Sequence, residues 1–168
     1  MKKNYKFSAI LIGLGNIGFK YDINKKQIKT HAKSLSLNNN FKVFCGIDQS
    51  KYILKKFKKI YNMECYKSIS LFKKDFKIIN LDLLIISVNT EQIYSIYKES
   101  VKNFNIKCIL IEKPVSYKIN EIEFILRDSI KRNIKVFINF PRNSLIQNTK
   151  FKNIFLNLYN KIEYININ

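Results

Sequence analysis

The stretch ILIGLGNIGFKYD, residues 10–22, concentrates glycine in a chain that contains little of it. Three of the four glycines in the 168-residue sequence, Gly13, Gly15 and Gly18, lie here. They form G-x-G-x-x-G between an expected strand and an expected helix. Gly13 permits a tight turn, Gly15 lets the backbone approach a pyrophosphate, and Gly18 allows close packing of helix on strand. The helix N-terminus would present amides to the phosphates, so the motif predicts a dinucleotide site. An ordinary turn is the alternative.

Asp48 is the second residue with an expected ligand. It ends the apolar run FKVFCGI, where a carboxylate can accept hydrogen bonds from ribose hydroxyls. The same carboxylate would repel a 2′-phosphate, which favours NAD over NADP, although Lys51 nearby keeps NADP open. A helix N-cap is the alternative role. Asp48 lies 35 positions after Gly13, beyond the usual spacing of roughly 20, and we assign the excess to an inserted lysine-rich loop, FKYDINKKQIK.

Lys113, in IEKPV, is the candidate catalytic residue. Glu112, Lys113 and Pro114 follow an apolar run at the carboxyl end of an expected strand, the edge where open α/β sheets bind ligands. Pro114 favours an extended conformation for Lys113 and so directs its ammonium into the crevice. A lysine there can hydrogen-bond a substrate hydroxyl or share its proton during oxidation. An ordinary loop lysine is the alternative.

The elements that would position these residues follow from the hydrophobic pattern. Consecutive apolar residues predict strands buried on both faces of a parallel sheet, at residues 7–12, 41–47, 82–88, 107–112 and 134–140, with a weaker outer strand around Tyr66. Amphipathic segments at 50–61, 90–104 and 120–132 predict helices between them, with Thr90 as an N-cap. This alternation indicates an α/β fold, a doubly wound parallel sheet of the Rossmann type.

The tail has a different pattern. Residues 143–158 have helical periodicity and are followed by the alternating run KIEYININ. We therefore expect a Rossmann domain over residues 1–142 and, over 143–168, the truncated start of a second α/β domain.

Composition excludes several classes of function. The formal net charge is +19, but only three of the 31 basic residues are arginines and the lysines are spread along the chain, which favours a solvated surface over a nucleic-acid site. Cys45, Cys65 and Cys108 have no C-x-x-C spacing and there is one histidine, so we expect reduced thiols and no metal site. No apolar run reaches the roughly 18 residues of a membrane span, and we expect a cytoplasmic protein without membrane partners.

The motifs together resemble a known family. GLGNIG, THAKSL, Asp48, DLLIIS, EKP and NFPR occur in the order seen in the glucose–fructose oxidoreductase/inositol dehydrogenase (Gfo/Idh/MocA) family, and the resemblance covers essentially the whole chain. It implies an N-terminal Rossmann domain that binds NAD(P). It also implies a C-terminal α/β domain that shapes the substrate pocket and often the dimer. Typical substrates are sugars, cyclitols or nucleotide sugars oxidised at a ring hydroxyl.

The resemblance also implies roles for single residues. Asp48 would hold the adenosine ribose, Glu112 and Lys113 would lie beside the nicotinamide, and Lys113 would touch the reacting hydroxyl. The pyrophosphate would be held by Gly13, Gly15, Asn16, Ile17 and Gly18. His31 matches a histidine of the family's first helix, for which we favour a packing or capping role. Asn89 replaces the family's Thr-Pro turn and would contact the cofactor through its backbone.

We therefore expect the N-terminal portion of an NAD-dependent sugar oxidoreductase, with NADP less favoured. The family's proton-transferring histidine and aspartate would lie beyond residue 168, so we expect little turnover, and a homo-oligomer only if the C-terminal domain is present. A non-catalytic dinucleotide-binding module or an inactive truncated remnant is the alternative.

Overall fold

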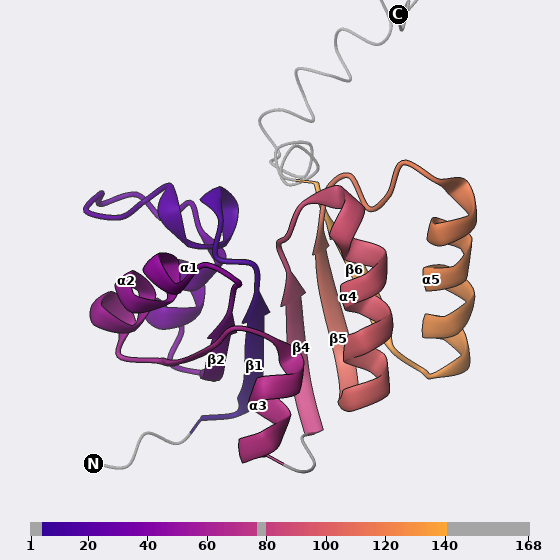
Figure 1. The fold of residues 1–168 in the computed structure, drawn as a ribbon, viewed down its shortest axis with the longest axis horizontal. Helices are drawn as coiled ribbons and strands as arrows, with labels where there is room; N and C mark the ends of the chain where they lie inside the picture. Colours follow the sequence, from indigo (N-terminus) through magenta and orange to yellow (C-terminus); the bar gives the residue numbers. More distant parts are fainter. Residues whose placement is uncertain (1–4, 77–79, 141–168) are drawn as a thin grey trace, which may run out of the picture. The chain divides into compact units, whose positions relative to one another are not determined.

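The computed structural model describes residues 5–76 and 80–140. Its sheet has six strands in the order β3-β2-β1-β4-β5-β6; all the strand pairs with a described register are parallel, and the arrows of β1, β4 and β5 point the same way in Figure 1. The strands are β1 (Phe7–Ile12), β2 (Phe41–Ile47), β3 (Glu64–Tyr66), β4 (Asn80–Ile86), β5 (Asn105–Glu112) and β6 (Lys135–Asn139). The order reverses between β1 and β4, which is the switch point where such sheets open a crevice. The predicted doubly wound fold is confirmed.

The central strands are buried on both faces. Alternate residues of β1 enter different clusters, Ile10 and Ile12 on one face of the sheet and Ala9 and Leu11 on the other. Because side chains alternate along a strand, each face needs its own cover of helices. The first face is covered by α3 (Ile69–Asp75), α4 (Thr90–Asn103) and α5 (Ile119–Lys131), and the second by α1 (His31–Leu37) and α2 (Lys51–Tyr61).

The helices predicted from amphipathic periodicity are present with small shifts at their ends. Ser50 caps α2 by accepting a hydrogen bond from the Ile53 amide, as expected of a serine at that position. Asn89, and not Thr90, is the N-cap residue of α4. Strand β4 ends at Ile86, two residues before the predicted end. Helix α3 was not predicted, because seven residues with two buried side chains carry too little periodicity.

The helix expected directly after the glycine motif is present as one turn only. The chain forms a single π-helical turn, η1 (Asn16–Lys20), in which the amides of Phe19 and Lys20 both donate to the Gly15 carbonyl at 2.9 Å. Phe19 is buried in the core and meets the Phe57 ring edge to face, with centroids 5.2 Å apart. The predicted polar loop FKYDINKKQIK therefore contains a core residue.

Asp22 gives the physical reason why no α-helix continues. Its buried carboxylate accepts hydrogen bonds from the amides of Lys29 and Thr30 at 2.7 and 2.8 Å, and from the Thr30 hydroxyl at 2.8 Å. These bonds lower the pKa of Asp22 against the opposing effect of its burial. They close the inserted segment into a loop, and α1 begins immediately after it.

The predicted second domain, residues 143–168, lies outside the described residues. Within residues 5–76 and 80–140, no helix is long and apolar enough to cross a membrane.

Candidate functional site

The glycine turn joins the carboxyl end of β1 to η1 and is tightly packed at its first glycine. Gly13 has φ +91°, a conformation that side chains disfavour, and its amide donates to the Ile47 carbonyl at 2.8 Å. A Cβ at this position would lie 2.2 Å from the carbonyl oxygen of Ser87. The turn is thus held against the ends of both neighbouring strands, β2 and β4.

The other two glycines of the motif differ in what surrounds them. A Cβ at Gly18 would lie 2.1 Å from the Gly13 carbonyl oxygen, so η1 packs directly on the turn. A Cβ at Gly15 would have none of the described heavy atoms within 4 Å. Gly15 therefore borders open space, while the glycines on either side of it serve packing.

That open space belongs to a cavity of about 370 Å3 at the carboxyl ends of β1, β2 and β4. Its volume falls within the range of small-molecule sites. Four residues with predicted cofactor contacts line it, namely Gly13, Gly15, Asp48 and Asn89. A crevice is therefore present at the switch point, and it contains the glycine turn.

Asp48 ties the glycine turn to the end of β2. Its Oδ2 accepts a hydrogen bond from the Leu14 amide at 2.9 Å and its Oδ1 accepts one from the Ser50 amide at 2.9 Å. The N-cap role considered for Asp48 belongs to Ser50 instead. Each carboxylate oxygen can accept a further hydrogen bond, and the half-buried side chain lines the cavity, so a donor such as a ribose hydroxyl can still be bound.

Asn89 lies across the cavity at the start of α4. It is exposed, its carbonyl accepts a hydrogen bond from the Gln92 amide at 2.9 Å, and its side chain makes no capping hydrogen bond. Ser87, two residues earlier, donates its amide to the Ile12 carbonyl at 2.7 Å and so holds the β4 end against β1.

Asn16 and Ile17, in η1, are exposed and are not among the described residues that line the cavity. Of the predicted pyrophosphate residues, Gly13 and Gly15 line the cavity.

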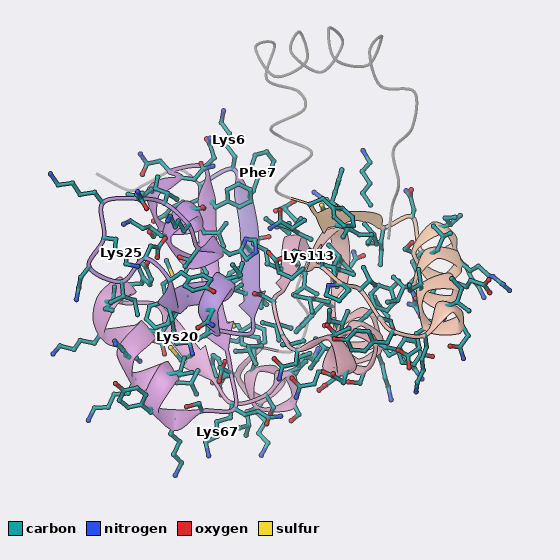
Figure 2. All side chains as sticks on the ribbon, turned by 90° about the horizontal axis from the view of Figure 1, so that it is seen from above. Lys6, Phe7, Lys20, Lys25, Lys67 and Lys113 are labelled. Carbon is teal, nitrogen blue, oxygen red and sulfur yellow. The ribbon has the colours of Figure 1, made fainter. Side chains whose placement is uncertain are left out.

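The remaining predicted residues lie at the end of β5. Lys113 is exposed and precedes Pro114 through a cis peptide bond. Figure 2, which views the molecule from above the strand ends, shows Lys113 well separated from Lys67, which lines the cavity. Of the described residues that line the cavity, none is from the Glu112–Lys113 pair.

Glu112 is hydrogen-bonded to the single histidine of the chain. The His31 Nε2 lies 2.6 Å from the Glu112 Oε1, and each side chain is 12% exposed. The capping role considered for His31 is wrong, because Thr30 is the N-cap of α1 and accepts the Lys33 amide. The sequence did not predict this pair, since 81 positions separate its members.

The cavity also has lining residues that sequence reasoning missed. They follow β2, β3 and β4 or lie on α4, and include Gln49, Lys67, Ser68, Ser87, Gln92 and Glu99. Ser87 was within the quoted motif DLLIIS, and its place directly after a central strand was the available signal. Lys67 and Ser68 follow the short outer strand, whose end was too weakly marked to locate them.

Cysteine chemistry is disfavoured at this site. Burial raises the pKa of the Cys45 thiol, and it raises that of Cys65 to about 11. Since the thiolate is the reactive form, both are weak nucleophiles at neutral pH. Among the described residues, no group of three or more His, Cys, Asp or Glu side chains is placed to hold a metal ion.

The chain matches one known protein family. Residues 7–140 match the GFO_IDH_MocA family, described as an oxidoreductase family with an NAD-binding Rossmann fold. No curated protein sequence matches the chain.

Solved structures share the fold at low sequence identity. A dehydrogenase from Clostridium difficile is 20% identical, with a TM-score of 0.70 over 88% of this chain and 43% of its own. The WlbA dehydrogenase from Chromobacterium violaceum, in complex with NADH and UDP-GlcNAcA, is 14% identical, with a TM-score of 0.70 over 94% and 41%.

A 3-ketoreductase variant from Actinomadura kijaniata, in complex with TDP-benzene and NADP, is 12% identical, with a TM-score of 0.70 over 90% and 44%. The chain thus spans less than half the length of these three proteins.

Proposed function

The chain belongs to the Gfo/Idh/MocA oxidoreductase family, whose fold is the NAD-binding Rossmann fold, and from that premise we propose that it binds NAD at the glycine turn. We further propose that it serves hydride transfer between the nicotinamide and a ring hydroxyl of a sugar, cyclitol or nucleotide sugar. The observation that carries the proposal is the open space beside Gly15 in a turn that is otherwise tightly packed. A pyrophosphate requires such an approach to the backbone.

The adenosine half of NAD would occupy the cavity. Asp48 would accept hydrogen bonds from the ribose hydroxyls through the acceptor capacity left by the Leu14 and Ser50 amides. Asn89 would border the cofactor from the start of α4. Asn16 and Ile17 would extend the pyrophosphate contact along η1, and Gly13 and Gly18 would hold the turn in shape.

The nicotinamide half would lie toward the end of β5. Bound NAD supplies the ring carbon that accepts a hydride. Lys113, exposed at this strand end, would donate a hydrogen bond to the substrate oxygen or share the hydroxyl proton as the hydride leaves. Glu112 would lie beside it. A substrate held in this orientation reacts faster chiefly because the reacting groups are already in place.

NAD is preferred over NADP in this proposal. A 2′-phosphate would meet the Asp48 carboxylate, which is unfavourable. Lys67, which lines the same cavity, is the residue best placed to offset that repulsion, and similar folds carry either NADH or NADP. We also propose a cytoplasmic location, small-molecule and not nucleic-acid partners, and a domain division at residue 142, with residues 143–168 as the start of a substrate domain.

The test is calorimetric titration of the full chain with NAD and NADP, with Gly15→Ala as the key variant. The Gly15 backbone is extended, with φ −68° and ψ −152°, and the methyl group of an alanine there would meet open space. Thermal stability should therefore be unchanged or slightly raised. NAD affinity should fall by about tenfold or more, because the methyl group would overlap the pyrophosphate.

Gly18→Ala is the matched contrast. Its methyl group would overlap a backbone oxygen, so the free energy of unfolding should fall by about 2 kcal/mol or more. Absence of NAD binding at millimolar concentration by the unmodified chain, or equal NAD affinity in Gly15→Ala, would show that the proposal is wrong.

A further inference from the structure

The His31–Glu112 pair joins two elements that are far apart in the sequence. His31 is the first residue of α1 and Glu112 is the last residue of β5. A separation of 2.6 Å between Nε2 and Oε1, with both side chains 12% exposed, is typical of a strong hydrogen bond shielded from water. Such a bond holds the end of β5 in a defined position relative to α1.

The backbone next to His31 is also held in place. Thr30 donates both its amide and its hydroxyl to the buried Asp22 carboxylate, each at 2.8 Å. Asp22 lies two residues after the end of η1, which packs against the glycine turn through Gly18. An unbroken series of close contacts therefore runs from the glycine turn, through Asp22, Thr30 and His31, to Glu112.

Glu112, at the end of this series of contacts, lies where the nicotinamide half of NAD is predicted to bind. Lys113 follows Glu112 directly, and neither lines the cavity assigned to the adenosine half. A hydrogen bond that fixes Glu112 therefore fixes the backbone from which the Lys113 side chain departs.

We propose that His31 is a positioning residue: through Glu112 it holds the end of β5 in the place where the nicotinamide half of NAD binds. This inference rests on the proposed NAD site. It separates His31 from the residues that bind the adenosine half, and it assigns a function to a pair whose other interpretation is a purely structural tie between α1 and β5.

The test compares two ligands on the full chain, NAD and ADP-ribose, which lacks the nicotinamide. His31→Phe keeps a planar ring and removes the hydrogen bond, whereas His31→Gln retains a donor. In His31→Phe, the affinity for NAD should fall about tenfold, the equivalent of one lost hydrogen-bonded contact, while ADP-ribose affinity should stay within about twofold. His31→Gln should recover most of the NAD affinity. Glu112→Gln changes the other residue of the pair, and it should lower the ratio of NAD affinity to ADP-ribose affinity, as His31→Phe does.

Glu64→Gln is the control for the loss of one ion pair. It disrupts the exposed Lys58–Glu64 pair, which is 2.9 Å long, and the ratio of NAD to ADP-ribose affinity should not change. If His31→Phe lowers both affinities equally, or neither, the pair is only structural and the inference is wrong although the NAD site stands. If the unmodified chain binds neither ligand, the proposed function fails as well.

Discussion

The three glycines of the GLGNIG motif have three different structural roles. Gly13 has a positive φ, Gly18 is required by a backbone oxygen 2.1 Å from where its Cβ would be, and Gly15 borders open space. The spacing of the motif predicted the tight turn at Gly13 and the packing contact at Gly18, and both are present. The approach of a pyrophosphate to Gly15 stays a prediction, for which the structure leaves space. The pairing of Asp48 with the Leu14 amide was not predictable, since it depends on where two strands end relative to each other.

Lys113 is the residue whose substitution tests the proposed hydride-transfer chemistry. Lys113→Ala should leave NAD affinity within about twofold, because the side chain is exposed and outside the described cavity lining. The slow NAD reduction expected of this chain with a panel of sugars and cyclitols should fall further, by about 100-fold or more, as expected when a proton-sharing group is lost. The measurement is NADH absorbance under saturating NAD.

Lys55→Ala is the matched control for charge, because Lys55 is exposed on α2. It should change neither quantity. Retention of NAD reduction in Lys113→Ala would argue that Lys113 is an ordinary loop lysine.

At the scale of elements, Asp82 joins the starts of three strands. Its Oδ2 accepts hydrogen bonds from the Ser8 amide and hydroxyl, both at 2.8 Å, and its Oδ1 accepts the Lys107 ammonium at 2.8 Å. The hydrogen bond and charge of Lys107 and the bonds from Ser8 lower the pKa of Asp82 to about 2. Strands β1, β4 and β5 are thereby held in register at the edge opposite the cavity.

Asp82→Asn should therefore destabilise the fold in a pH-dependent way. The pKa of the folded state lies below that of the unfolded state, so the stabilisation is complete above the unfolded value and is lost as the pH falls through the folded one. Urea unfolding at pH 7 should show a loss of about 1–2 kcal/mol. Near pH 3, the difference between the variant and the unmodified protein should shrink to about half.

Lys107→Met removes the ion pair with Asp82 and leaves the hydrogen bonds from Ser8 in place. Lys107 is 78% exposed, so its ion pair should contribute less than about 1 kcal/mol. If the effect of Asp82→Asn is the same at both pH values, the charge of Asp82 does not contribute, and only the geometry of its hydrogen bonds does.

At the scale of the whole molecule, the dominant physical feature is the net charge of +19. Six ion pairs are found among the described residues, and most have an exposed member. Repulsion among the lysines should therefore outweigh the attraction within these pairs. Raising NaCl from about 20 mM to about 300 mM should raise the melting temperature by about 2–5 °C, because salt screens that repulsion.

Choline chloride at equal ionic strength is the control for ion-specific effects and should act similarly. A melting temperature that falls with salt would mean that the attractive pairs dominate instead.

The local pattern of the chain was enough to predict the central strands, the three longer helices and the glycine turn, although it missed α3 and placed the N-cap of α4 one residue late. Runs such as Phe7–Ile12 and Phe41–Ile47 have the apolar pattern of buried parallel strands, and the glycine spacing carries the turn, so the fold class and membership of an NAD(P)-binding family were predictable. The tertiary structure alone decided the rest. The π-helical turn follows from the burial of Phe19 and the hydrogen bonds of Asp22, and the contact of His31 with Glu112 requires strands and helices to be assembled first. Such contacts have no local signal, because their energies depend on distances between residues that the chain order does not specify.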